Sequence, residues 1–343
     1  MNVLVIGLGR IGALHAATLG LDPRVERLLL LDPDQARRES LCGSMRRARP
    51  VPELDDALSA GIDAAVVASP SRTHFEHVAR LLDAGVAVFC EKPLALSCGD
   101  VAALGAKAGA TPLMVGFQRR FDDAYRRLQE ACLVARERGC PPTMYRLATG
   151  DPLPPPASYL AVAGSIFHDM LIHDFDLLSF LSPEPVVAVG ARASVAALQD
   201  GAPGWGTAIA VCELADGSVA SLAGSRQTGG GYEVTGQVTS PFGTFGIGLA
   251  VDNAPYDHLD LPLRPATCRW PSFLERFRGA YRRELAHFLD VVAGEPLEGA
   301  GATEMLRALA LADTAERSAS GPGLALAVQL QGLEATCADR AIA

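Results

Sequence analysis

The chain has 343 residues, of which 49% are hydrophobic and 20% charged, with a net charge of −9. This composition excludes a disordered chain and a coiled coil, and the length suggests two domains of roughly 100–200 residues each. The negative charge disfavours nucleic acid or an anionic membrane as partner. No apolar run approaches the roughly 18 residues of a membrane span, and the first residues lack a secretory leader's basic flank, so a cytoplasmic location is expected.

The first 120 residues alternate short apolar runs with longer amphipathic ones, the pattern of strands and helices in a parallel sheet. The expected strands are 2–6, 27–31, 64–68, 87–90 and 113–116. The expected helices are 11–20, 33–42, 72–84 and 99–109. Several of these strands are continuously apolar, which indicates a sheet covered on both faces.

The pattern changes in the second part of the chain. Residues 151–156 read Asp-Pro-Leu-Pro-Pro-Pro and predict an extended loop, because proline has no amide hydrogen to donate. Helices are expected at 121–138, 167–181, 272–292 and 302–318. Strands without intervening helices are expected at 186–189, 207–214, 218–223, 232–239 and 243–247, with turns at 216–217 and 241–243. Such consecutive strands predict a largely antiparallel sheet.

A glycine-rich hexamer, Gly7-Leu8-Gly9-Arg10-Ile11-Gly12, lies between the first expected strand and the first expected helix. In this pattern the first glycine allows a tight turn, the second lets the backbone approach a pyrophosphate, and the third lets helix and strand pack closely. The helix then points free amides and the positive end of its dipole at the phosphates. Asp32 ends the next strand twenty residues after Gly12, where a carboxylate would bind ribose hydroxyls and repel a 2′-phosphate. The hexamer and Asp32 predict a dinucleotide site that favours NAD over NADP.

Lysine is scarce in this chain: only Lys92 and Lys107 occur among thirty Lys and Arg residues. Lys92 follows an expected parallel strand, at the carboxyl end where open α/β sheets bind ligands. An ammonium can lose its proton when desolvated, whereas a guanidinium effectively cannot. Lys92 could therefore polarise a hydroxyl or carbonyl beside a nicotinamide. The residues alone leave this role and that of a solvated loop lysine open.

Residues 167–176 combine acids and histidines with an apolar helical pattern. On one continuous helix Asp169, His173 and Asp176 would share a stripe, and carboxylates beside an imidazole suit it to act as a general base. Asp174 is expected to point elsewhere, on solvated surface. A surface helix with incidental charges is the alternative, but the apolar flanks favour a mostly buried helix.

No metal site is predicted. Two oxygens and one nitrogen on a single helix make a poor zinc set, and the eight cysteines form no C-x-x-C pair. Reduced, structurally inert thiols are the expected state of these cysteines in a cytosolic protein.

The motifs occur in a recognisable order. Gly7-x-Gly9-x-x-Gly12 is followed by Ser-Pro-Ser-Arg-Thr-His at 69–74, by Glu91-Lys92-Pro93, by Gly-Phe-Gln-Arg-Arg-Phe-Asp at 116–122, and by Asp-Met-x-x-His-Asp-x-Asp at 169–176. This sequence resembles the Gfo/Idh/MocA family of NAD(P)-dependent oxidoreductases, and within it the inositol 2-dehydrogenase branch. The resemblance runs from residue 3 to about residue 250.

The resemblance implies an α/β protein with a parallel-stranded Rossmann domain over 1–120. A C-terminal α+β domain over 121–343 would follow, built on a largely antiparallel open sheet that binds substrate and mediates a homodimer or homotetramer; its last helices could pack back on the first domain. The implied catalytic residues are Lys92, Asp169 and His173. The implied cofactor-binding residues are Gly7, Gly9, Arg10, Ile11, Gly12, Asp32, Ser69, Pro70, His74, Glu91 and Lys92. Arg119, Asp176 and Tyr232 would join the catalytic residues in contacting the substrate.

The chain departs from the family pattern at three places. Ser71 stands where asparagine is usual, Ala163-Gly164-Ser165 replaces an expected glycine pair, and residues 146–149, Arg-Leu-Ala-Thr, lack the His and Asn typical of inositol dehydrogenases. The last difference bears on the substrate and argues against assuming myo-inositol.

The expected function is therefore hydride transfer between a secondary alcohol of a cyclitol, aminocyclitol or sugar and NAD. Two alternatives stay open: a ketoreductase of a nucleotide-linked keto-sugar, and an NAD-binding regulatory protein that keeps the fold without catalysis.

Overall fold

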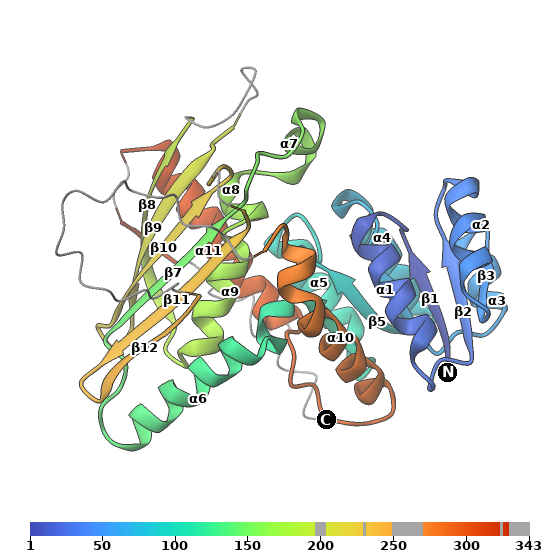
Figure 1. Cartoon of the computed structure of the whole chain (residues 1–343), viewed down its shortest axis with the longest axis horizontal. Helices are drawn as coiled ribbons and strands as arrows, with labels where there is room; N and C mark the ends of the chain where they lie inside the picture. Colours follow the sequence, from blue (N-terminus) through green and yellow to red (C-terminus); the bar gives the residue numbers. More distant parts are fainter. Residues whose placement is uncertain (196–203, 229–230, 249–269, 323–324, 329–343) are drawn as a thin grey trace. The chain divides into compact units, whose positions relative to one another are not determined.

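The computed structural model of the chain describes residues 1–195, 204–228, 231–248, 270–322 and 325–328. These residues form two compact units, and Figure 1 labels many of their elements. The first unit contains Met1–Phe121 and Gly279–Leu309, and the second contains the described parts of Asp122–Arg278 and Ala310–Gln329. No helix in these ranges is both long enough and apolar enough to cross a membrane.

The first unit is built on six parallel strands in the order β3-β2-β1-β4-β5-β6. The strands are β1 (Asn2–Ile6), β2 (Arg27–Leu31), β3 (Ala48–Pro50), β4 (Ala64–Val67), β5 (Ala87–Glu91) and β6 (Leu113–Gly116). The helices are α1 (Arg10–Leu21), α2 (Gln35–Ser44), α3 (Leu54–Ser59), α4 (His74–Asp83) and α5 (Cys98–Ala108), with short 3₁₀ turns η1 (Ser71–Thr73) and η2 (Gln118–Phe121). The strand order reverses at β1 and β4, the switch point where open α/β sheets bind ligands at the carboxyl ends of the strands.

All five strands predicted for this sheet are confirmed, and the residues of β4 and β6 are buried throughout, as expected of a sheet covered on both faces. The sequence does not predict β3 or α3, because three and six residues carry too little periodicity to be recognised. Helix α10 (Phe273–Val292) contributes Phe288 to this core, with its ring 5.8 Å from that of Phe89.

The second unit is built on seven strands in the order β12-β11-β7-β10-β9-β8-β13. They are β7 (Met144–Gly150), β8 (Val186–Ser194), β9 (Thr207–Leu214), β10 (Val219–Ser225), β11 (Glu233–Ser240), β12 (Gly243–Ile247) and β13 (Leu326–Ala327). Only β7 and β10 run parallel among these neighbours, so the predicted largely antiparallel sheet is confirmed. The helices are α6 (Asp123–Glu137), α7 (Ala157–Ala163), α8 (Ile166–Asp169), α9 (Ile172–Leu181) and the last part of α11 (Ala302–Ser320).

Helices α6, α8 and α9 pack on one face of this sheet (Figure 1). Along β9 the residues alternate between exposed and buried, as a sheet with one covered face requires. The predicted turn at Asp216-Gly217 joins β9 to β10, and Gly217 adopts a φ of +81° that favours glycine.

Strand β7 is the main element that the sequence does not predict. It lies in the middle of the sheet and buries Tyr145, Leu147 and Thr149. Arg146 occupies an exposed position of this alternation and breaks the apolar run, so a search for apolar runs misses the strand.

The helix predicted over 167–181 is wrong as a single piece. Helix α8 ends at Asp169 and α9 begins at Ile172. At the junction the Leu171 amide donates to the Ile166 carbonyl, and the His173 amide donates to the Met170 carbonyl at 3.3 Å. Because these bonds span five and three residues instead of four, spacing along the sequence does not by itself place Asp169 and His173 on one helical stripe.

Candidate functional site

The glycine-rich hexamer forms the turn between β1 and α1. Gly7 has a φ of +85°, and a Cβ there would lie 2.6 Å from the Ser69 backbone. A Cβ on Gly12 would lie 1.8 Å from the Gly7 carbonyl oxygen. Gly9 occupies the N-cap of α1 without a capping side chain, and a Cβ there would meet nothing within 4 Å. The turn therefore presents the start of α1 to an open space, the arrangement that suits a pyrophosphate.

Asp32 lies at the end of β2, beside this turn and almost fully buried. Its Oδ2 accepts a hydrogen bond from the Leu8 amide at 2.7 Å, and its Oδ1 accepts one from the Asp34 amide at 2.9 Å. Arg37 on α2 also approaches both carboxylate oxygens at 3.3 Å. Asp32 thus ties the glycine-rich turn to β2, with Arg37 as a cationic neighbour that the sequence pattern does not indicate.

His74 joins the loops that follow β4 and β5. Its Nδ1 lies 2.7 Å from the Pro93 carbonyl oxygen and its Nε2 lies 2.7 Å from the Ser69 carbonyl oxygen. Ser69 in turn contacts the Thr73 hydroxyl at 2.8 Å. Burial lowers the pKa of His74, although both carbonyl contacts oppose this change by favouring the charged ring. Pro70 lies in the same loop, so the predicted cofactor residues of this segment sit at the carboxyl end of β4.

Glu91 and Lys92 stand at the carboxyl end of β5. The Oε1 of Glu91 lies 2.7 Å from Nε2 of His15, a fully buried histidine on α1. Gly116 is the register partner of Glu91 on β6, and a Cβ there would approach the Glu91 carboxylate to 3.1 Å. His15 therefore fixes the residue that precedes Lys92. In the sequence His15 is recognisable only as a histidine on the apolar side of α1. A histidine at such a position is more commonly a core residue than a functional one.

In the second unit Asp169 is held by two donors. Arg226, which follows β10, donates from Nη1 to Oδ2 of Asp169 at 2.9 Å. The Tyr159 hydroxyl on α7 donates to Oδ1 at 2.8 Å. Sequence reasoning identifies Asp169 but not these partners, because they come from other elements, 57 residues away for Arg226 and 10 residues away for Tyr159.

The prediction that Asp174 lies on solvated surface is wrong. Asp174 is fully buried, and its Oδ2 accepts a hydrogen bond from the Thr149 hydroxyl of β7 at 2.8 Å. A buried carboxylate needs such donors, and a helical pattern cannot reveal a donor on a strand. Asp176 is also buried, whereas His173 is half-buried.

The other two residues predicted to contact the substrate, Arg119 and Tyr232, belong to different units. Arg119 lies buried in η2 of the first unit. Tyr232, in the second unit, packs its ring against Phe273 and Phe277 with centroids 6.2 Å apart, and its amide donates to the Trp270 carbonyl at 3.0 Å. Much of the Tyr232 ring is therefore part of the core.

His168 forms a cluster to which the sequence assigns no role. Its Nε2 lies 2.7 Å from Asp313 and its Nδ1 lies 3.3 Å from Glu316, both on α11. The same Nδ1 lies 3.0 Å from the Ser165 hydroxyl. The ring thereby fastens α8 to α11. Within the described ranges no group of three or more His, Cys, Asp or Glu residues could hold a metal ion.

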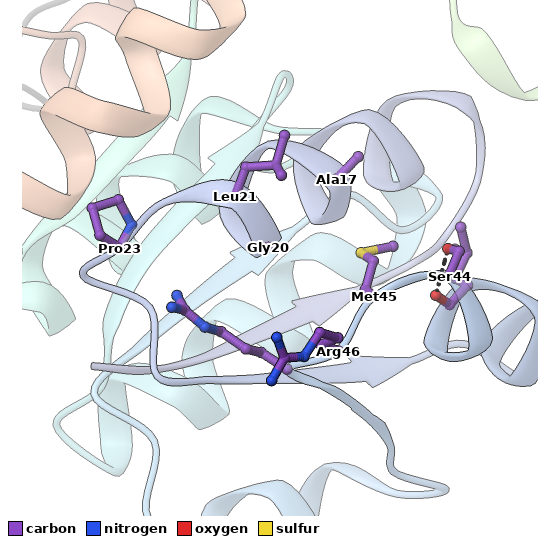
Figure 2. A pocket seen from close by; sticks show the side chains of 9 residues that line it. Ala17, Gly20, Leu21, Pro23, Ser44, Met45 and Arg46 are labelled. Carbon is purple, nitrogen blue, oxygen red and sulfur yellow. Dashed lines mark hydrogen bonds between the residues drawn. The ribbon is translucent and has the colours of Figure 1, made fainter.

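A cavity of about 750 Å³ lies in the first unit, away from the residues described above (Figure 2). Gly20 and Leu21 at the end of α1 line it together with Met45 and Arg46. Because α1 begins at the glycine-rich turn and ends at this cavity, the cavity and the turn lie at opposite ends of the helix. None of the predicted site residues lines it.

Comparisons with known proteins cover nearly the whole chain. Residues 1–117 match the Gfo/Idh/MocA model described as an oxidoreductase family with an NAD-binding Rossmann fold, and residues 133–246 match the Gfo/Idh/MocA C-terminal domain. A myo-inositol dehydrogenase of Streptomyces leeuwenhoekii is 34% identical over 335 residues, covering 95% of this chain and 100% of the relative.

Solved structures agree with these matches. The crystal structure of a putative myo-inositol dehydrogenase from Sinorhizobium meliloti 1021 superposes with a TM-score of 0.82 at 29% identity, covering 96% of this chain and 100% of the other. That of scyllo-inositol dehydrogenase from Lactobacillus casei, with bound NAD(H) and scyllo-inositol, has a TM-score of 0.81 at 25% identity, covering 96% and 99%.

Proposed function

Because this chain belongs to the Gfo/Idh/MocA family of NAD-binding oxidoreductases, we propose that it oxidises a secondary alcohol of a cyclitol, aminocyclitol or sugar with NAD. The observation that carries the proposal is its similarity to inositol dehydrogenases over 95% of the chain. Asp169, His173 and Asp176 support it, since they lie buried or half-buried where acid–base chemistry is shielded from water.

The glycine-rich turn fits a dinucleotide. The uncapped start of α1 would hold the pyrophosphate, and Asp32 would accept hydrogen bonds from the adenosine ribose. Its carboxylate disfavours a 2′-phosphate, which supports a preference for NAD over NADP, although Arg37 at 3.3 Å offsets part of that charge. Bound NAD would supply the hydride acceptor.

The chain's own residues would handle the proton. In this proposal His173 takes the hydroxyl proton of the substrate, with Asp169 assisting it. The Lys92 ammonium stabilises the negative charge that develops on the substrate oxygen. Arg119, Asp176 and Tyr232 would contact the remaining hydroxyls.

The substrate need not be myo-inositol. Arg146 on β7 is exposed and donates to the Gln237 side chain at 2.6 Å, so it belongs to the outer face of the sheet. On the inner face of the same strand, Thr149 is engaged with Asp174. Residues 146–149 of this strand lack the His and Asn that inositol dehydrogenases tend to carry there, which supports a cyclitol or sugar with a different hydroxyl pattern.

Two alanine variants test the chemistry. A screen of cyclitols, aminocyclitols and sugars with NAD and NADP, followed by NADH or NADPH absorbance, first identifies a substrate. Lys92→Ala and His173→Ala should then each lower kcat by about 100-fold or more while NADH fluorescence titration shows that both variants still bind NADH. Lys107→Ala is the matched control, because the chain's other lysine pairs with Asp83 on the protein surface. Near-normal turnover in either test variant would overturn the proposal.

The outer face of the second unit's sheet supports self-association into a dimer or tetramer. Val187, Ile209, Val211 and Val219 expose between 41% and 53% of their surface there, on adjacent strands. An apolar face of this kind is typical of an interface. Introducing glutamate at Ile209 and Val211 together should reduce the molar mass measured by light scattering, whereas Leu133→Glu on α6 should not. A wild-type monomer would contradict the proposal.

A further inference from the structure

We infer that Arg226 and Tyr159 are positioning residues that hold the Asp169 carboxylate for the reaction, an inference that rests on the proposed function. Arg226 is almost completely buried, with 1% of its surface exposed. Its Nη1 donates to Oδ2 of Asp169 at 2.9 Å, and the Tyr159 hydroxyl donates to Oδ1 at 2.8 Å. Each carboxylate oxygen therefore has its own donor. The two donors come from different elements, Tyr159 from α7 and Arg226 from the residue after β10.

Arg226 is itself firmly anchored. It directly follows β10, and its amide donates to the Gly206 carbonyl at 2.8 Å. Burying a guanidinium is costly unless a counter-charge compensates it, and Asp169 supplies that charge with 13% of its side chain exposed. The pair therefore couples Asp169 to the sheet.

This coupling matters because of the break between α8 and α9. Asp169 is the last residue of α8, and the regular helix resumes only at Ile172. Since no continuous helix joins Asp169 to His173, the backbone alone does not set the orientation of the carboxylate. The sheet sets it instead, through Arg226, and α7 completes the hold through Tyr159.

If the ion pair only stabilises the fold, the effect of replacing Arg226 on kcat should not depend on Asp169. If Arg226 positions Asp169, the loss of kcat should require the Asp169 carboxylate. A double-mutant cycle separates these two cases. Arg226→Met should lower kcat by about 100-fold, a loss that a misplacement of about 1 Å can cause, with unchanged NADH binding. In an Asp169→Asn background the same substitution should lower kcat less than about threefold, because the group that it positions is already disabled.

Conservative variants complete the test. Arg226→Lys should recover much of the lost turnover, because only one guanidinium nitrogen contacts Asp169 and an ammonium can replace a single bond. Tyr159→Phe removes one hydroxyl from a residue that is 41% exposed, so it should fold normally and lower kcat by about 3- to 10-fold, again only when Asp169 is present. If Arg226→Met does not fold, the kcat values of Tyr159→Phe and Arg226→Lys test the inference in its place.

Arg136→Met is the matched control. Arg136 belongs to the same unit, and its guanidinium donates to the neutral hydroxyls of Tyr145 and Ser182. Its replacement should lower the melting temperature and leave kcat within about twofold. Equal losses of kcat from Arg226→Met with and without Asp169, or no loss at all, would overturn the inference. When that outcome is accompanied by retained turnover in Lys92→Ala and His173→Ala, the proposed function fails as well. When those two variants lose turnover, the proposed function stands and only the positioning role of Arg226 and Tyr159 is rejected.

Discussion

Replacing Gly12 with alanine tests the geometry of the glycine-rich turn. The new Cβ would lie 1.8 Å from the Gly7 carbonyl oxygen, a backbone atom that cannot rotate away. To reach the 3.4 Å at which ordinary contact begins, α1 and the turn would have to separate by about 1.6 Å. Overpacking of this kind costs about 1–3 kcal/mol, which in a unit of about 150 residues lowers Tm by about 2–12 °C.

Gly9→Ala is the matched comparison within the same hexamer. Gly9 has a φ of −64°, which any residue adopts, and a Cβ there meets nothing within 4 Å. Its replacement should change stability by less than about 1 kcal/mol and yet weaken NADH binding, because the methyl group would occupy space next to the uncapped helix start.

The assay pairs thermal unfolding without cofactor with NADH fluorescence titration. Gly12→Ala should lose both stability and affinity, whereas Gly9→Ala should lose affinity alone. A Gly12→Ala protein with wild-type Tm, or a Gly9→Ala protein that is the less stable of the two, would refute the reasoning.

Two further predictions concern buried polar groups. Thr149→Val removes the hydroxyl that donates to Asp174, so the free energy of unfolding in urea should fall by about 1.5–3 kcal/mol, with Thr149→Ser close to wild type; an unchanged urea midpoint would contradict this. Burial lowers the pKa of His74 below its ordinary 6.5, so the unfolded chain binds more protons and stability should fall as pH drops below about 6.5. His74→Gln should flatten that dependence in melts between about pH 7.5 and 5.5, and equal slopes in the two proteins would count against it.

Several features of the molecule follow from the sequence alone. The strands of the parallel sheet are short continuous apolar runs, and such runs need two covering layers wherever they fold. The turn at Gly7 and the close approach at Gly12 depend on backbone stereochemistry within six residues. Asp32 lies beside that turn because β1 and β2 are adjacent parallel strands, an arrangement that the spacing of motif and acid already indicates.

Only the tertiary structure decides which polar side chains meet. His15 and Glu91 are 76 residues apart, Arg226 and Asp169 are 57 apart, and Thr149 meets Asp174 across 25. The position of Asp174 on the expected helix predicts a solvated side chain, yet Asp174 is buried, and β7 supplies the donor that compensates its burial. The physical reason is that hydrophobic periodicity records which face of an element is apolar, whereas a buried charge depends on a partner from another element, and periodicity carries no trace of that partner.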